Sequence, residues 1–134
     1  MTTIKLGERE LKIKYGFEAT VKSGIIRKLA SLGSDNEDGV ESITKTLEIL
    51  PELILAGVQK YHSDEFGYNY KTEEGKEEAL SKIYSLVDDY FDGEDADFGE
   101  ILDTLQNELM ENGFLAKMLR EEIAEQKTEE KKSR

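Results

Sequence analysis

The sequence contains no cysteine, and among its 134 residues there are one proline and one histidine. Without cysteine the chain forms neither a disulfide nor a thiolate metal site, so packing must hold the fold, as is usual in a reducing cytosol. The single histidine, His62, has no cysteine partner for catalysis and no second imidazole for a typical zinc site. We therefore interpret His62 as an exposed loop residue, and we expect no metal, no cofactor and no enzymatic activity.

Long hydrophobic runs are missing as well. No apolar stretch approaches the roughly 18 to 20 residues that cross a bilayer, and the N-terminus lacks the apolar segment of a signal peptide. We therefore expect a cytoplasmic protein with no membrane contact. Positive charge is scarce, since 18 Lys and Arg oppose 30 Asp and Glu, a net charge of −12. This balance argues against direct binding of nucleic acid, which needs clustered basic residues.

The charge that is present is divided unevenly along the chain. Residues 1–32 hold seven basic and three acidic side chains, a balance of +4, whereas the remainder holds 11 basic and 27 acidic ones, a balance of −16. Opposite ends of two such molecules attract each other, and salt weakens that attraction. The pattern fits either a homo-oligomer assembled head to tail or an ordinary solvated surface.

The first 15 residues predict a β-hairpin. Apolar residues alternate with polar ones on either side of Gly7, and they are Ile4, Leu6, Leu11, Ile13 and Tyr15. This period of two gives a ribbon one apolar face, and Gly7 allows the turn. Because an isolated hairpin is only marginally stable, we expect it to pack on helices or to pair with another strand through its open edge.

Apolar residues spaced three and four apart then predict helices. The first helix is expected from about Phe17 to Leu32, with its stripe at Val21, Ile25, Leu29 and Leu32 and with Gly33 as its cap. The second begins at the capping pair Asp38 and Glu41. Its stripe comprises Val40, Ile43, Leu47 and Leu50, followed by Ile54, Val58 and Tyr61. Pro51 either kinks this helix or opens a new one.

Three further helices are expected in the second half. Residues 63–71 are predicted to form a loop, after which Thr72 caps a helix that ends at Gly93. The apolar face of that helix comprises Leu80, Ile83, Tyr84, Val87, Tyr90 and Phe91. Asp97 and Glu100 form a capping pair before Ile101, Leu102, Leu105 and Leu109, and a break is expected at Asn112-Gly113. A last short helix carries Phe114, Leu115, Met118, Leu119 and Ile123.

These patterns together predict a mainly α (α+β) fold with a short N-terminal β-hairpin followed by a bundle of about five helices. We expect one domain over residues 1–125 and a flexible, charged tail over residues 126–134, because the tail contains no large apolar residue. The acidic stretch 88–97 does not fit a calcium loop, since tyrosine and glycine fall where oxygen ligands belong. It is better interpreted as a connection between helices.

Three segments carry a resemblance to a known family. They are Ile4-Lys5-Leu6-Gly7, residues 11–17 (LKIKYGF) and residues 24–29 (GIIRKL). In this order, ahead of acidic helices, they resemble the start of the tail assembly chaperones of long-tailed phages and prophages. The resemblance implies a host-cytoplasmic protein that binds and solubilises the tape-measure protein and is not retained in the virion. It also implies that a longer form, made by ribosomal frameshifting, recruits the tail-tube protein.

A chaperone of this kind must offer apolar surface within a charged rim. The candidate partner-binding residues are Phe66, Tyr68 and Tyr70 in the predicted loop and Phe114, Leu115, Met118 and Leu119 in the last helix. The same side chains are also suited to ordinary core packing. Two other functions stay open: an acidic DNA mimic that inhibits a nucleic-acid-binding partner, and a small hydrolase with a polar pocket around His62.

Overall fold

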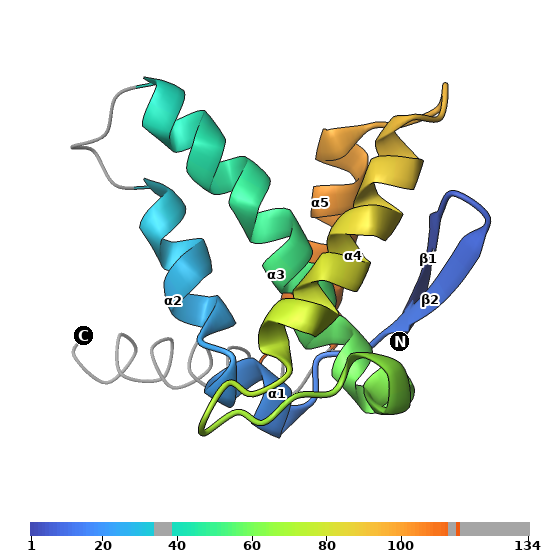
Figure 1. Ribbon diagram of the computed structural model, residues 1–134. Helices are drawn as coiled ribbons and strands as arrows, with labels where there is room; N and C mark the ends of the chain where they lie inside the picture. Colours follow the sequence, from blue (N-terminus) through green and yellow to red (C-terminus); the bar gives the residue numbers. More distant parts are fainter. Residues whose placement is uncertain (34–38, 113–114, 116–134) are drawn as a thin grey trace, which may run out of the picture.

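The structure is a computed structural model, and it describes residues 1–33, 39–112 and 115. Within these residues the chain forms an antiparallel hairpin followed by five α-helices (Figure 1). The elements are β1 (Thr2–Leu6), β2 (Arg9–Ile13), α1 (Phe17–Lys22), α2 (Ile25–Ala30), α3 (Gly39–Phe66), α4 (Lys76–Phe91) and α5 (Phe98–Asn107). A 3₁₀ turn (Ser31–Gly33) follows α2, and a π-helical turn (Glu108–Asn112) follows α5. The prediction of a mainly helical fold with an N-terminal hairpin is confirmed.

The hairpin packs one face against the helices, as its alternating sequence predicted. Thr2 lies opposite Ile13 and Leu6 opposite Arg9, with Gly7 in the turn at a φ of 65°. The inward side chains Ile4, Leu6, Leu11 and Ile13 are buried. Strand β2 lies against α3, where the Lys14 amide donates to the Gly57 carbonyl at 2.9 Å. The hairpin is thus anchored to the longest helix of the described chain.

His62 lies in α3, so the prediction of a loop histidine was wrong. Its Nε2 accepts a hydrogen bond from the Lys12 amide at 3.0 Å, and its ring meets Phe66 edge to face. The backbone of α3 departs from helical geometry at His62, with φ −128° and ψ 28°. His62 therefore fastens the middle of β2 to the last turns of α3.

The single helix expected over residues 17–32 is divided in two. Helix α1 ends at Lys22, and α2 begins after Gly24, whose φ of 72° belongs to the left-handed region. Glycine adopts this conformation at little cost, because it has no Cβ. The break reorients α2, so that Ile25 is buried while Val21 is left exposed.

Several helix ends differ from the prediction. Helix α3 continues through Pro51 and extends to Phe66, four residues into the expected loop. Helix α4 begins at Lys76, because Gly75 precedes it with a φ of 86°. Thr72 instead accepts the Glu74 amide within the preceding turn.

The expected cap of α5 is confirmed. The Asp97 carboxylate accepts the Glu100 amide at 3.1 Å, which satisfies one of the helix donors that have no partner inside the helix. The Asp97 amide in turn donates to the Tyr90 hydroxyl at 2.8 Å. This second bond ties the start of α5 to the end of α4. The capping residue Asp38 and the expected break at Gly113 lie outside the described residues.

Side chains from the hairpin and from α2 to α5 share one core. Its largest fully buried members include Tyr15, at the end of the hairpin, and Phe66, at the end of α3. One carboxylate, that of Glu108, is buried at the edge of this core, where it lies 2.7 Å from the Met1 amino group and accepts from Asn112. Pairing of this kind offsets the penalty of taking a carboxylate out of water.

Candidate functional site: an uncovered face of helix α3

The apolar stripe of α3 changes from exposed to buried along its length. Beyond Pro51, Ile54 and Val58 are fully buried, as is Leu50 just before it. In the first three turns, Val40 is 74% exposed, Ile43 63% and Leu47 52%. The first part of the stripe is therefore largely exposed, and its three residues are called the α3 face below.

The first turns of α3 are left exposed because α3 is longer than the helices that pack on it. Helix α3 has 28 residues, whereas α4 has 16 and α5 has 10. At 1.5 Å per residue, α3 is about 35 Å long up to its break at His62, and α4 and α5 are about 24 and 15 Å long. The hairpin, α4 and α5 pack on α3. Figure 1 shows the first half of α3 diverging from α4 and α5, with α2 beside it.

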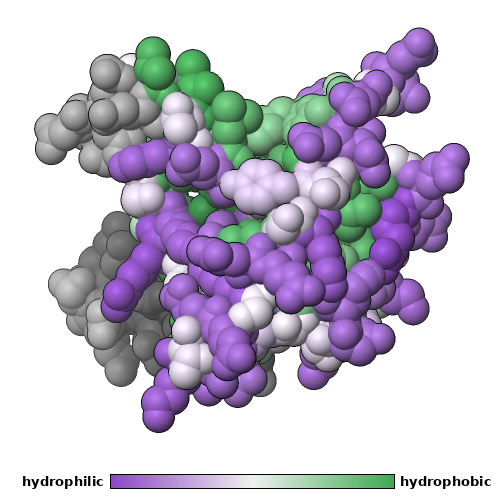
Figure 2. Space-filling view, in the orientation of Figure 1, coloured by the Kyte–Doolittle hydropathy of each residue, from purple (hydrophilic) through white to green (hydrophobic). Residues whose placement is uncertain are grey.

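The α3 face is apolar where much of the surface around it is charged. In Figure 2 a hydrophobic area covers the first half of α3 at the upper left, and hydrophilic side chains cover most of the remaining view. Val40, Ile43 and Leu47 are spaced three and four residues apart, so they lie on one side of the helix. A stripe with this spacing is the surface against which a second helix normally packs.

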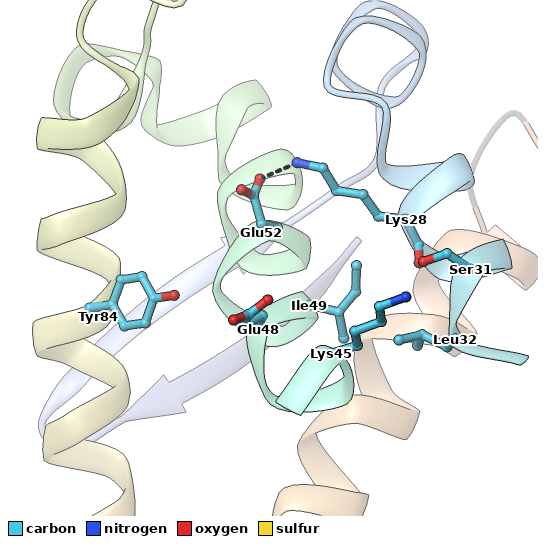
Figure 3. A pocket seen from close by; sticks show the side chains of 8 residues that line it. All are labelled: Lys28, Ser31, Leu32, Lys45, Glu48, Ile49, Glu52 and Tyr84. Atoms are coloured by element: carbon cyan, nitrogen blue, oxygen red, sulfur yellow. Dashed lines mark hydrogen bonds and ion pairs between the residues drawn. The ribbon is translucent and has the colours of Figure 1, made fainter. Parts of the chain in front are cut away.

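A cleft of about 350 Å³ lies between α2, α3 and α4, about half a turn around α3 from the α3 face. Figure 3 shows its lining, in which Ile49 and Leu32 supply the apolar part. Glu52 lies 2.9 Å from the Lys28 ammonium and 3.6 Å from that of Lys76. These contacts tie α2 and the start of α4 to α3. The polar lining of the cleft is therefore partly engaged in ion pairs at the middle of α3.

The acidic side chains and the single histidine do not form a metal site in the described part of the chain. Across residues 1–33, 39–112 and 115, no group of three or more His, Cys, Asp or Glu side chains is placed to hold a metal ion. His62 is engaged with the Lys12 amide and with the Phe66 ring, which gives it a role in packing.

None of the helices in the described part of the chain is both long and apolar enough to cross a membrane.

The candidate residues Phe66, Tyr68 and Tyr70, called the aromatic segment below, lie in or beside the core. Phe66 is 1% exposed and belongs to the core. Tyr68 and Tyr70 are partly buried, with ring centroids 5.0 Å apart in an edge-to-face arrangement, and the Lys76 ammonium lies 5.9 Å from the Tyr68 ring centroid. Burial raises the pKa of Tyr68 to about 12, and it also raises the pKa of Tyr70. Tyr68 and Tyr70 are therefore only partly accessible to a partner.

The candidate residues of the last helix are almost all beyond the described part of the chain. Leu115 is partly buried and packs against the core. Phe114, Met118 and Leu119 lie outside the described residues. Among the described residues, Leu115 is thus the one candidate of the last helix that can be placed, and it packs on the core instead of forming an exposed surface with the aromatic segment.

The sequence interpretation missed the α3 face because its three residues have the spacing of a core stripe. Periodicity shows that residues share a side of a helix, but it does not show whether another element covers that side. The stripe extends over five turns, from Val40 to Val58, and nothing in its spacing separates the exposed first part from the buried second part.

A comparison with known protein families, with curated proteins and with solved structures found no match. Two observations therefore bear on function. One is the α3 face, and the other is the resemblance carried by residues 4–29.

Proposed function

We propose that this protein is a tail assembly chaperone of a long-tailed phage or prophage, which binds the tape-measure protein and keeps it soluble until the tail tube forms. The observation that carries the proposal is the α3 face, an apolar helix surface with no covering element among the described residues. The resemblance of residues 4–29 to this family supplies the biological context. In this role the protein acts in the host cytoplasm, helps to recruit tail-tube subunits and is absent from the virion.

The α3 face suits a helical client. An amphipathic helix laid along α3 buries its own apolar stripe against Val40, Ile43 and Leu47 by ordinary helix packing. Full burial of one such side chain contributes about 1.5–3 kcal/mol. Three of them give weak binding once the entropy of association is subtracted. Many copies bound along one long client hold it far more tightly than a single copy does.

The acidic surface serves the same role. A net charge of −12 keeps a complex with exposed apolar surface soluble, because like-charged particles repel each other. Such a coat also prevents neighbouring client chains from associating through their apolar stripes.

The test is co-expression with a tape-measure protein. We expect the client to appear in the soluble fraction with the wild-type protein and to aggregate when Ile43 and Leu47 are both changed to Ser. Val21→Ser is the matched control, since Val21 is also exposed but lies on α1. Circular dichroism must show that all variants are equally helical. A tape-measure chain that stays insoluble beside the wild-type protein, or stays soluble beside the double variant, contradicts the proposal.

An acidic DNA mimic is the second candidate. The observation in its favour is the run of exposed carboxylates where α4 ends and α5 begins, at Asp88, Asp89, Asp92, Glu94, Asp95 and Asp97. A mimic competes with DNA for a basic DNA-binding protein in a salt-dependent way, whereas a helix-binding chaperone does not. Strong competition that survives the Ile43→Ser/Leu47→Ser change favours the mimic.

A further inference from the structure

The outer edge of strand β1 presents unused backbone groups. Opposed residues in an antiparallel pair alternate between those that exchange backbone hydrogen bonds and those whose groups point outward. The Lys12 amide donates to His62, away from β1, so Lys12 and the opposed Thr3 form a pair of the outward kind. Lys5 and Glu10, two positions along, form another such pair. The backbone N–H and C=O groups of Thr3 and Lys5 therefore point away from the hairpin.

The two outer edges of the hairpin differ in how they are covered. On the β2 side, the Lys12 amide donates to His62, and the amide of Lys14, just past the strand, donates to the Gly57 carbonyl of α3. On β1, no hydrogen bond joins the backbone of Thr3 or Lys5 to another element of the described chain. An uncovered strand edge of this kind is a template for pairing with a further strand.

A groove of about 230 Å³ runs beside this edge. Residues 3–5 of β1 line one side of it, and the other side is formed by Tyr90, Asp95, Glu100, Ile101 and Thr104. These five belong to α4, α5 and the connection between them. Figure 1 shows the hairpin beside α4. A groove between a strand edge and a helix suits an extended segment, because its backbone pairs with the strand while alternate side chains reach the helix.

The helix side of the groove is negatively charged. Asp95 and Glu100 contribute two exposed carboxylates, and no basic residue lines that side. The Glu100 amide is already bonded to Asp97, but the Glu100 side chain has no hydrogen bond or ion pair within the described chain. An extended segment with lysine or arginine at alternate positions matches this charge, whereas an acidic one is repelled.

We propose that the β1 edge binds an extended, basic segment of a partner protein by strand addition. The main-chain bonds go to Thr3 and Lys5, and the basic side chains pair with Asp95 and Glu100. A second copy of this chain is the weaker fit, because pairing of two β1 strands brings two acidic groove walls together. The site lies apart from the α3 face and does not depend on the function proposed above.

The probe is a short capped peptide that alternates lysine and valine, titrated into the isotope-labelled protein and followed by NMR. We expect the amide signals of Thr3 and Lys5 to move downfield and their hydrogen exchange to slow, while the signals of Ile43 and Leu47 stay in place. A peptide that alternates glutamate and valine must not bind. A lysine-valine peptide with its backbone amides N-methylated must also fail, because it cannot complete the main-chain bonds.

Variants separate backbone pairing from charge attraction. Thr3→Pro removes an outward N–H without touching the β1–β2 ladder, and proline is tolerated on an exposed strand edge. We expect it to weaken peptide binding roughly tenfold relative to Thr3→Val. Asp95→Asn and Glu100→Gln should each weaken binding roughly two- to fivefold at low salt. Glu94→Gln and Asp103→Asn are the matched controls, since they remove equal charge outside the groove.

Several outcomes overturn the proposal. One is binding that survives N-methylation of the peptide, because this shows charge attraction alone. Another is wild-type affinity in Thr3→Pro when the cross-strand signals of Leu11 and Ile13 show an intact hairpin. A third is concentration-dependent dimerisation that Thr3→Pro abolishes, since the occupant of the edge is then a second copy. The absence of binding by the lysine-valine peptide also counts against it.

Discussion

At the scale of single residues, Tyr15 connects the end of the hairpin to the core. Its side chain is 1% exposed, and its hydroxyl donates to the Leu53 carbonyl of α3 at 2.8 Å. Burial, and to a lesser degree the nearby Glu108 carboxylate, raise the pKa of Tyr15 well above its ordinary value. The hydroxyl is therefore kept protonated inside the fold, where its hydrogen bond orients the chain that leads into α1.

Replacing Tyr15 by Phe should lower the free energy of unfolding at neutral pH by about 1 kcal/mol, because one buried hydrogen bond is lost. Above about pH 10 the tyrosine loses its proton in the unfolded chain but keeps it in the folded one. Stability from this group is thus present below that pH and is lost as pH rises further. Urea unfolding at a series of pH values should show the gap between wild type and Tyr15→Phe narrowing above about pH 10. A stability difference that does not change with pH contradicts a buried, protonated Tyr15 hydroxyl.

At the scale of elements, the close approach of β2 and α3 determines where the hairpin lies. A Cβ built on Gly57 would lie 2.7 Å from Ile13 Cγ2 and 3.2 Å from the Tyr15 ring. The absence of a side chain at Gly57 therefore allows the strand to rest directly on the helix backbone. The same close approach brings the Lys14 amide to the Gly57 carbonyl.

Gly57→Ala should destabilise the protein although alanine is the better helix former. The overpacking cost of about 1–3 kcal/mol exceeds the helix-propensity gain of up to about 1 kcal/mol. The matched control is Gly39→Ala in the same helix, where nothing lies within 4 Å of the added Cβ. Thermal unfolding should show a lower midpoint for Gly57→Ala and no loss for Gly39→Ala. Equal thermal midpoints for the two variants would contradict the close contact between β2 and α3 at Gly57.

At the scale of the whole molecule, opposite charges are concentrated in different parts of the chain. The hairpin, α1 and α2 belong to the basic part of the chain, and α4 and α5 belong to the acidic part. The acidic run that ends α4 is exposed, and so are Lys22 and Arg27 of α1 and α2. A molecule with this distribution of charge attracts copies of itself in a head-to-tail arrangement.

Light scattering across a salt series should detect this self-association. We expect a mass above that of the monomer at low salt and a fall toward the monomer at about 1 M salt, where the screening length is about 3 Å. Charge reversal at Arg27, an exposed site, should give the low-salt monomer without a change in helicity. A monomer at every salt concentration, or an assembly that salt does not affect, contradicts the prediction.

The sequence predicted best where one local interaction decides the structure. The period of two fixed the hairpin and its buried face, and the Asp97–Glu100 spacing located the start of α5. It predicted poorly where a single glycine decides between conformations. Gly24 and Gly75 both adopt a positive φ, and one divides the first helix while the other delays the start of α4. A glycine in a helical pattern permits either outcome, and the surrounding packing selects one.

The candidate site could not be predicted for a related reason. The sequence by itself determined that Val40, Ile43 and Leu47 share a side of a helix, because the 3.6-residue repeat is a property of the backbone. Only the tertiary structure decided that this side is exposed while Ile54 and Val58 are buried. Burial depends on which other elements reach a surface, and here the relative lengths and directions of α3, α4 and α5 leave the first half of α3 uncovered.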